Sequence, residues 1–204
     1  MKKYFFIVIA SISLSVVIFS YTGPIFTPVR KPISKDSLIK RGVYLVTIMG
    51  CNDCHTPLKM GPKGPERDMD RLLSGHPDYI PVSKFDTSTS KNWVLFGMTG
   101  TAMIGPWGSS FSANLTSDAT GIGNWTEEQF KKVFREGKFK GLDANRMILP
   151  PMPWENYVNL KDEDISAIFA YLKSTKPVRN IVPQHVTPDK LSTYLDPTSA
   201  ERKL

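Results

Sequence analysis

A helical domain with a long irregular insertion is predicted by three amphipathic segments and by the composition of the chain between the first two of them. Residues 37–49, 126–135 and 162–174 place apolar side chains at helical spacing. Residues 56–110, in contrast, are rich in Gly, Pro, Ser and Thr and show no helical period. The chain of 204 residues is 41% apolar, so it can bury one core of ordinary size.

The first helix is expected over residues 37–49. Leu38, Leu45 and Ile48 approximate an apolar stripe, and Gly50 ends the helix. Gly42 lies inside the segment, where a glycine costs helix stability. We therefore expect a packing reason for Gly42, because a bare Cα lets another helix approach closely.

The second and third helices carry their own start and stop signals. Thr126-Glu127-Glu128-Gln129 is a capping box, which predicts a helix from there to about Arg135, ended by Gly137. The third helix, residues 162–174, has three acidic residues in its first turn and is followed by Pro177. Its apolar positions have i, i+3, i+4, i+7 spacing: Ile165, Ile168, Phe169 and Leu172.

The insertion, about residues 56–110, has weak strand signals at residues 93–96 and 102–104, which suggest a hairpin. Loops of this length inside a compact domain are usually functional or disordered. Trp93, Phe96 and Trp107 argue against full disorder.

The ends of the chain differ from the domain expected over residues 37–176. Residues 4–21 carry no charge and follow two lysines, so residues 1–21 are expected to form an apolar helix that serves as a membrane anchor or signal segment. We favour an uncleaved anchor, with cleavage after Ser20 as the alternative. Residues 22–36 form a proline-stiffened linker, and residues 177–204 a polar, proline-containing tail that wraps the surface or frays.

The most informative motif is Cys51-Asn52-Asp53-Cys54-His55, which has the C-x-x-C-H spacing of a covalently attached haem c. Two thiols three positions apart can form thioethers with both vinyl groups of one porphyrin. The adjacent imidazole of His55 can then ligate the iron through Nε2. The motif thus predicts one haem c, held by Cys51, Cys54 and His55.

Three other uses of a C-x-x-C pair fit less well. A thioredoxin-like dithiol belongs in a βαβ context, which the flanking sequence does not offer. A zinc site would need two of the three histidines, and these lack the usual spacing. A disulfide across two residues would be strained and would close almost no loop.

A haem iron used for electron transfer needs a second axial ligand, and Met152 is the leading candidate. Its segment, Leu149-Pro150-Pro151-Met152-Pro153-Trp154, is stiffened by prolines, so holding a thioether against an iron costs little entropy. Met98 and Met103 are the competing thioethers. His76 and His185 are the alternatives that would give two histidine ligands.

The formal charge of +7 permits nucleic acid, anionic lipid or acidic protein as a partner. Nucleic acid fits poorly with an exported chain, and haem propionates offset part of the charge. We expect redox protein partners, with a scattered solvated surface as the simpler explanation of the charge.

The helices, the haem motif and the segment around Met152 together resemble a class I, monohaem c-type cytochrome. They are most similar to the cytochrome c modules of membrane-bound alcohol, aldehyde and gluconate dehydrogenase cytochrome subunits. The resemblance spans residues 37–176 outside the insertion. It is carried by these stretches: Arg41-Gly42-Val43-Tyr44-Leu45, the haem motif, Phe111-Ser112-Ala113-Asn114-Leu115-Thr116, Gly121 to Phe130, Leu149 to Trp154, and Leu160 to Leu172.

The resemblance implies the all-α cytochrome c fold, with the long insertion lying between the haem motif and the middle helix. It implies that the terminal helices cross near Gly42, that Met152 is the distal ligand, and that Trp125 lies near a haem propionate. Those subunits carry three haem motifs and this chain has one.

We therefore expect an electron-transfer protein, not an enzyme, that exchanges single electrons between redox partners of a respiratory or dehydrogenase chain. It would sit at the bacterial cell membrane with its haem domain on the periplasmic side, or be soluble in the periplasm if residues 1–20 are removed. A small peroxidase-like haem enzyme and a haem-based sensor are the alternatives; both would need a labile sixth ligand. The expected apolar pocket walls are Leu115, Ile122, Phe130, Ile148 and Leu149.

Overall fold

The computed structural model describes residues 34–195, which lie in the second of two compact units, residues 34–204. The expected apolar helix of residues 1–21 and most of the linker lie outside the described residues. Among residues 34–195, no helix is both long and apolar enough to cross a membrane.

Six α-helices and four 3-10 turns occur in the described part of the chain. The α-helices are α2 (Lys35–Ile48), α3 (Cys51–His55), α4 (Glu127–Glu136), α5 (Trp154–Tyr157), α6 (Asp162–Ser174) and α7 (Leu191–Leu195). The 3-10 turns are η1 (Met69–Arg71), η2 (Thr89–Lys91), η3 (Phe139–Gly141) and η4 (Pro188–Lys190).

The expectation of an all-α fold is wrong, because the insertion folds into two small antiparallel sheets. A hairpin joins β1 (Leu58–Gly61) to β2 (Gly64–Arg67), and a second sheet has the strand order β3-β4-β5, formed by Leu95–Phe96, Ala102–Gly105 and Gly108–Phe111. Backbone groups that cannot pair within a helix must pair elsewhere when they are buried. The Gly- and Pro-rich turns of this region allow them to pair across short strands.

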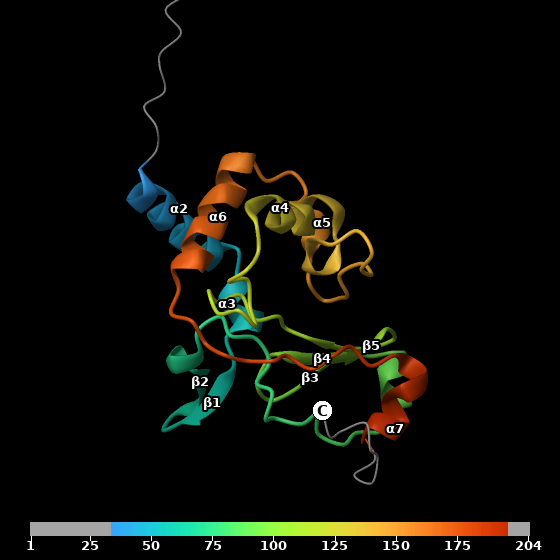
Figure 1. Ribbon diagram of the computed structural model, residues 1–204. Coiled ribbons are helices and arrows are strands. Elements are labelled where there is room, and N and C mark those ends of the chain that lie inside the picture. The colour runs from blue at the N-terminus through green and yellow to red at the C-terminus, as the bar shows by residue number, and fades with distance from the viewer. Residues whose placement is uncertain (1–33, 196–204) are drawn as a thin grey trace, which may run out of the picture. The chain divides into compact units, whose positions relative to one another are not determined.

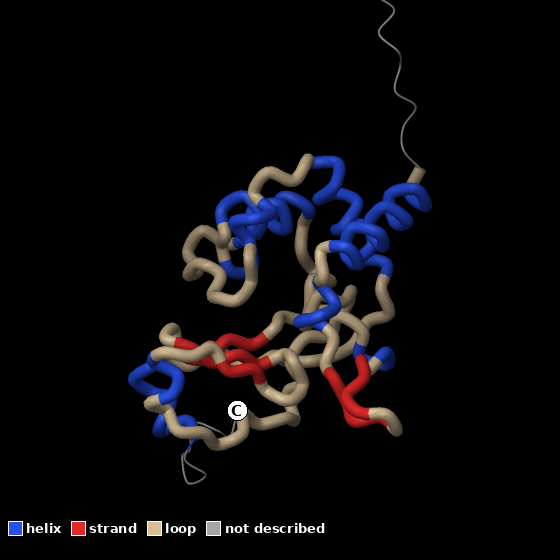
Figure 2. Tube along the Cα trace, turned by 180° about the vertical axis from the view of Figure 1, so that it is seen from behind, coloured by secondary structure: helices blue, strands red, loops and turns tan. Residues whose placement is uncertain are grey.

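Helices α2, α4, α5 and α6 lie together at one end of the described unit, whereas both sheets and helix α7 lie towards the other (Figure 1). The view from behind shows the same separation (Figure 2). The main core lies among the helices and contains Leu45, Val46, Leu73, Ile122, Phe130, Phe134, Ile165, Ala167, Ile168 and Leu172. A second, smaller core of Ile104, Val186 and Leu191 joins the three-stranded sheet to the C-terminal tail.

The crossing of α2 and α6 confirms the packing reason expected for Gly42. A Cβ added at Gly42 would collide with the backbone carbonyl of Ala167 and with the Cβ of Tyr171. The two helices therefore touch where one of them has no side chain, and residues 45 and 46 of α2 enter the main core beside α6.

The predicted ends of α4 and α6 are confirmed in detail. Thr126 caps α4 by accepting a hydrogen bond from the backbone N–H of Gln129, at 3.1 Å. Gly137 ends α4 with a left-handed conformation, at φ 62°. The α6 helix covers the expected residues, and Lys161 stands at its N-terminus without a side-chain cap.

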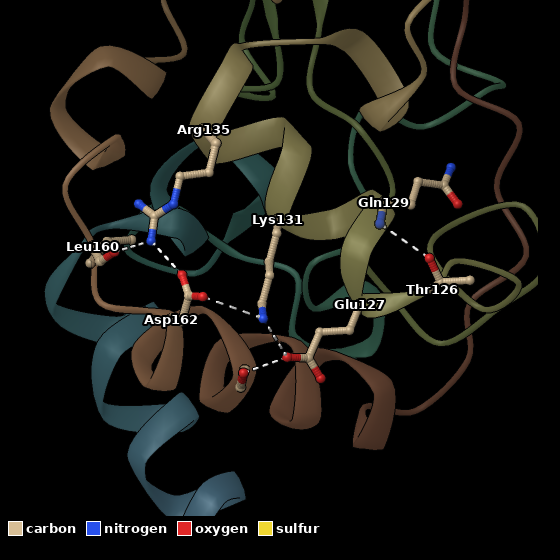
Figure 3. Close-up of polar contacts among 8 residues, drawn as sticks. Thr126, Glu127, Gln129, Lys131, Arg135, Leu160 and Asp162 are labelled. Carbon is tan, nitrogen blue, oxygen red and sulfur yellow. Dashed lines mark hydrogen bonds and ion pairs between the residues drawn. The ribbon is translucent and has the colours of Figure 1, made fainter.

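A polar network fastens α4 to α6 and to the segment that precedes α6 (Figure 3). Asp162 accepts a hydrogen bond from Arg135 at 2.7 Å and forms an ion pair with Lys131 at 3.7 Å. Arg135 also donates to the backbone carbonyls of Val158 and Leu160. Because Val158 directly follows α5, this network also fixes the end of that helix.

The C-terminal tail is more deeply integrated than expected, because it supplies buried groups. Asn180 is fully buried, and its side-chain amide donates to the carbonyls of Ser74 and His76 at 2.7 and 2.9 Å. Its side-chain oxygen accepts from the N–H of Asp78 at 3.0 Å. The tail thus holds the first part of the insertion in place.

Candidate functional site

The two cysteines lie on α3, which is a single helical turn. Gly50 precedes it in a left-handed conformation, at φ 69°, which turns the chain between α2 and α3. Cys51 and Cys54 are free thiols, both half-buried, and Cys51 packs against the main core. Residues three apart on a helix share a face, so both sulfur atoms can reach one planar group.

The imidazole of His55 is oriented by a backbone carbonyl from beyond the insertion. Its Nδ1 atom lies 2.8 Å from the carbonyl oxygen of Ala113, and because a carbonyl only accepts, Nδ1 carries the proton. The Nε2 atom is then unprotonated in the neutral ring. Burial lowers the pKa of His55, which favours this neutral form. Metal-ligating histidines typically donate such a hydrogen bond from the ring nitrogen that does not bind the metal.

The protonation of the thiols argues against a redox-active dithiol. Burial, with smaller effects from neighbouring charges, raises the pKa of Cys51 to about 11. Burial also raises the pKa of Cys54, followed by the charge of Asp53. Dithiol oxidoreductases depend on thiols whose pKa is lowered. Within residues 34–195, no three or more His, Cys, Asp or Glu side chains are grouped so that they could hold a metal ion.

Met152 is half-buried and packs against the same core as Cys51. Two hydrogen bonds hold the chain on either side of it. The hydroxyl of Ser110 donates to the carbonyl of Pro150 at 2.7 Å, and the hydroxyl of Tyr157 donates to the carbonyl of Met49 at 3.2 Å. Met49 is two residues before Cys51, so the segment that carries Met152 is tied directly to the start of the haem motif.

Met49 is half-buried and also packs against the main core, whereas the remaining methionines of residues 34–195 are either exposed or buried. Met98, a competing thioether, is 79% exposed in the turn between β3 and β4. Met103, the second competitor, is buried in β4 opposite Ser110 of β5. Paired residues on neighbouring strands share a face of the sheet, so Met103 is on the face whose Ser110 contacts Pro150. Also exposed are Met60, Met69 and Met147.

His76 and His185 both make hydrogen bonds that support the fold. His76 is 1% exposed; its Nε2 donates to the carbonyl of Ile80 at 3.0 Å, and its Nδ1 lies 2.9 Å from the hydroxyl of Thr101. Both ring nitrogens of His76 are therefore occupied. His185 donates from Nδ1 to the carbonyl of Ser109 at 2.6 Å, which ties the tail to β5.

Trp125 and the expected pocket walls mostly line the main core. Trp125 is half-buried against that core, and its backbone N–H donates to the carbonyl of Ile122 at 3.0 Å. Ile122 and Phe130 are fully buried in the core, and Leu115 packs against it. Ile148 and Leu149 are half-buried in the segment that leads to Met152.

Arg71, the last residue of η1, and Ser74, three positions later, carry buried polar groups without partners among residues 34–195. The Nε and Nη2 atoms of Arg71 and the Oγ atom of Ser74 are buried and have no hydrogen-bond partner within the described range. The segment that follows η1 reaches the haem motif, because the N–H of Gly75 donates to the carbonyl of His55 at 2.8 Å. A guanidinium with unused donors is complementary to a carboxylate, and a haem carries two propionates.

Three features of the site had no clear signal in the sequence. The carbonyl of Ala113 is a backbone group, so no residue type announces it. Ser110 lies among several serines with no distinguishing pattern. Tyr157 lies five positions after Met152 in a helix of four residues, which is too short to show a helical period.

Comparison with known proteins identifies related cytochrome subunits. No family model matches the chain. It is 32% identical over 143 residues to the fructose dehydrogenase cytochrome subunit of Gluconobacter japonicus, a match that covers 69% of this chain and 22% of that protein. It is 30% identical over 139 residues to the gluconate 2-dehydrogenase cytochrome c subunit of Pantoea cypripedii, covering 68% of this chain and 23% of that protein. It is also 30% identical over 145 residues to the cytochrome c subunit of the alcohol dehydrogenase (quinone) of Gluconobacter oxydans, covering 70% of this chain and 23% of that protein.

A haem motif with an oriented histidine and a core of crossed terminal helices defines the class of c-type cytochromes. Within that class, the chain is homologous to one region of the cytochrome c subunits of membrane-bound dehydrogenases. It spans less than a quarter of the length of these subunits. The relatives are cytochrome subunits, which are electron-transfer components and not the catalytic enzymes themselves. The expected resemblance to dehydrogenase cytochrome subunits is therefore confirmed.

Proposed function

We propose that this chain carries one covalently attached haem c and passes single electrons between redox protein partners of a dehydrogenase or respiratory chain. The observation that carries the proposal is the geometry of the haem motif. Cys51 and Cys54 share one helical turn with His55, whose Nδ1–H donates to Ala113 and whose Nε2 is thereby available.

Each site residue has a distinct role in this proposal. Cys51 and Cys54 form the two thioethers, and His55 Nε2 is the proximal ligand. Met152 supplies the distal thioether, and Trp125 lies near a propionate. When bound, the haem supplies a one-electron Fe(III)/Fe(II) couple, and thioether ligation favours the reduced state.

The surrounding protein keeps the site closed to reactive small molecules. With His55 and Met152 as ligands, the iron would have no open coordination position, and the main core, against which Cys51 and Met152 pack, would keep water away. Because the protein contributes binding, orientation and electrostatics, no bond in a substrate is made or broken. The formal charge of +7 favours a partner with an acidic docking surface.

We also propose that the chain is exported and works on the periplasmic side. Uncharged residues 4–21 after Lys2 and Lys3 support this proposal, because such a segment directs export or anchors a chain. In the anchored form, the haem domain faces the periplasm. Mass analysis of the N-terminus of the protein purified from membranes tests whether the chain is cleaved after Ser20.

The experiment that tests the proposed function is carbon monoxide binding to the reduced wild-type protein. An electron carrier with two protein ligands should bind carbon monoxide weakly, and its ferric form should show the weak sulfur-to-iron absorption band. Rapid, tight binding by the wild type would instead indicate a labile sixth site, as in a peroxidase-like enzyme or a sensor. The Met152→Ala variant is the positive control, because its sixth position should be open.

A further inference from the structure

The segment that carries Met152 is held from two different parts of the fold. On one side, β5 of the insertion contacts it through the 2.7 Å hydrogen bond from Ser110 to Pro150. On the other side, α5 is tied to Met49, two residues before the haem motif, through the 3.2 Å hydrogen bond from the Tyr157 hydroxyl to the Met49 carbonyl. Met152 follows Pro150 by two positions and precedes Tyr157 by five, so both bonds act close to its side chain.

Ser110 stands on a well-supported strand. The chain is fixed on both sides of it. The N–H of Ser109, on β5, donates to the tail carbonyl of Val186 at 2.8 Å, and the N–H of Ser112, just after β5, donates to the carbonyl of Thr101 at 2.9 Å. The hydroxyl of Ser110 also accepts a hydrogen bond from the indole N–H of Trp107, at 3.3 Å. That contact leaves the Ser110 proton free to point at Pro150.

Tyr157 is equally constrained. Its ring packs edge-on against Phe134 of α4, with the ring centres 6.0 Å apart. Burial is also the main cause of the raised pKa of Tyr157. Trp154, at the start of α5, fills the space over Gly137, where an added Cβ would collide with its indole.

We propose that Ser110 and Tyr157 are positioning residues that hold the Met152 thioether at the iron, and that the three-stranded sheet of the insertion supports the distal ligand. The proposal rests on the proposed function. Each hydroxyl donates to a backbone carbonyl, that of Pro150 or that of Met49, and neither is assigned as an iron ligand. Each acts by limiting the conformations of the segment that carries Met152, so that less entropy is lost when the sulfur ligates.

The test is competition by imidazole for the sixth position of the ferric holoprotein, followed through the sulfur-to-iron band. Ser110→Ala and Tyr157→Phe each remove one hydroxyl and leave the packing intact. We expect each variant to bind imidazole about five-fold more tightly than the wild type, which corresponds to about 1 kcal/mol, the usual net value of one hydrogen bond. Ser110→Thr keeps a hydroxyl and should restore the wild-type affinity.

Matched controls separate positioning from general destabilisation. Ser90→Ala removes a hydroxyl that donates to the carbonyl of Thr87 at the same 2.7 Å, elsewhere in the insertion. Tyr171→Phe removes a phenol at the crossing of α2 and α6. Both controls should leave imidazole affinity at the wild-type value even if they lower the melting temperature.

The outcomes distinguish this inference from the proposed function. Wild-type imidazole affinity in both Ser110→Ala and Tyr157→Phe, with the haem and the sulfur-to-iron band present, would overturn the positioning roles alone. If imidazole affinity rose equally in the two control variants, the positioning roles of Ser110 and Tyr157 would be overturned as well. A wild-type protein without covalent haem, or one in which Met152→Ala leaves the band unchanged, would refute the proposed site and the positioning roles together.

Discussion

The Nδ1 atom of His55 lies 2.8 Å from the carbonyl oxygen of Ala113, although 58 positions separate the two residues in the chain. The whole insertion with its two sheets lies between these residues in the chain, so the insertion must fold in a way that brings Ala113 back to the haem motif. The buried side chain of Asn114 helps to fix this return, because its amide donates to the carbonyl of Val178 at 2.9 Å. The orientation of the proposed proximal ligand therefore depends on the insertion and on the tail.

Replacing Met152 tests the distal ligand directly. Met152→His should keep two protein ligands but lower the midpoint potential, because imidazole stabilises Fe(II) less than a thioether does. Axial ligands set potentials over a range of about 0.8 V, so the change should be large in a redox titration. Met103→Leu is the control, since Met103 is the other buried thioether near Pro150. If the midpoint potential fell in Met103→Leu and stayed unchanged in Met152→His, Met103 would be the distal ligand instead.

Gly42→Ala should destabilise the protein through the crossing of α2 and α6. The added methyl would meet the Ala167 carbonyl and Tyr171 Cβ, and overpacking of this kind typically costs about 1–3 kcal/mol. Denaturant unfolding of the holoprotein measures the loss. Gly97→Ala is the matched control, because its new methyl would lie 3.4 Å from the nearest atom and should cost little. Equal stability of the two variants would contradict the close helix contact.

The stability of the fold should fall in mildly acidic solution because of His76. Burial lowers the folded-state pKa of His76 below its ordinary value of 6.5, and its Nδ1 already accepts from Thr101. A lowered pKa means that full stability is present above about pH 6.5 and is lost as the pH falls through the folded-state value. Unfolding free energies measured between about pH 7.5 and pH 5 should show this slope. In His76→Gln the slope should be smaller; an unchanged slope would show that other groups cause it.

Asn180→Ala should loosen the tail from the insertion. The substitution leaves the buried carbonyls of Ser74 and His76 and the N–H of Asp78 without their partners, and such losses cost about 1–3 kcal/mol each. Hydrogen exchange should show faster opening of the 74–78 segment and of the tail. Asn145→Ala, which removes a single bond to the carbonyl of Phe139, should leave that segment protected. Unchanged exchange in Asn180→Ala would mean that the tail is not an anchor.

Local signals made the helices predictable. The α6 helix has its expected bounds because its apolar period and its acidic first turn act within one segment. Thr126 and Gly42 were local signals as well. The N-cap at Thr126 is confirmed, although the side-chain amide of Gln129 donates to the carbonyl of Lys140. The close helix contact expected at Gly42 is confirmed too, with partners in α6. The C-x-x-C-H motif is local in the same sense, because the spacing of its three side chains is set within α3; its haem chemistry stays a prediction.

The sheets and the tail were harder to predict because long-range contacts form them. All four residues of β4 are buried, so the strand shows no alternation of apolar and polar residues. Asn180 is a polar residue in a proline-containing stretch, and only its partners more than a hundred positions away explain its burial. The hydrogen bond from His55 to Ala113 likewise depends on a backbone group that carries no residue-specific signal.

The most direct test of the central claim is the intact mass of the purified protein, measured together with its pyridine haemochrome spectrum. We predict that the wild type carries the mass of one haem after denaturation, with a spectrum of the c type, and that a Cys51→Ala/Cys54→Ala double variant loses that mass. A wild-type mass equal to that of the polypeptide alone, or a haem that separates on denaturation, would contradict the assignment of Cys51, Cys54 and His55.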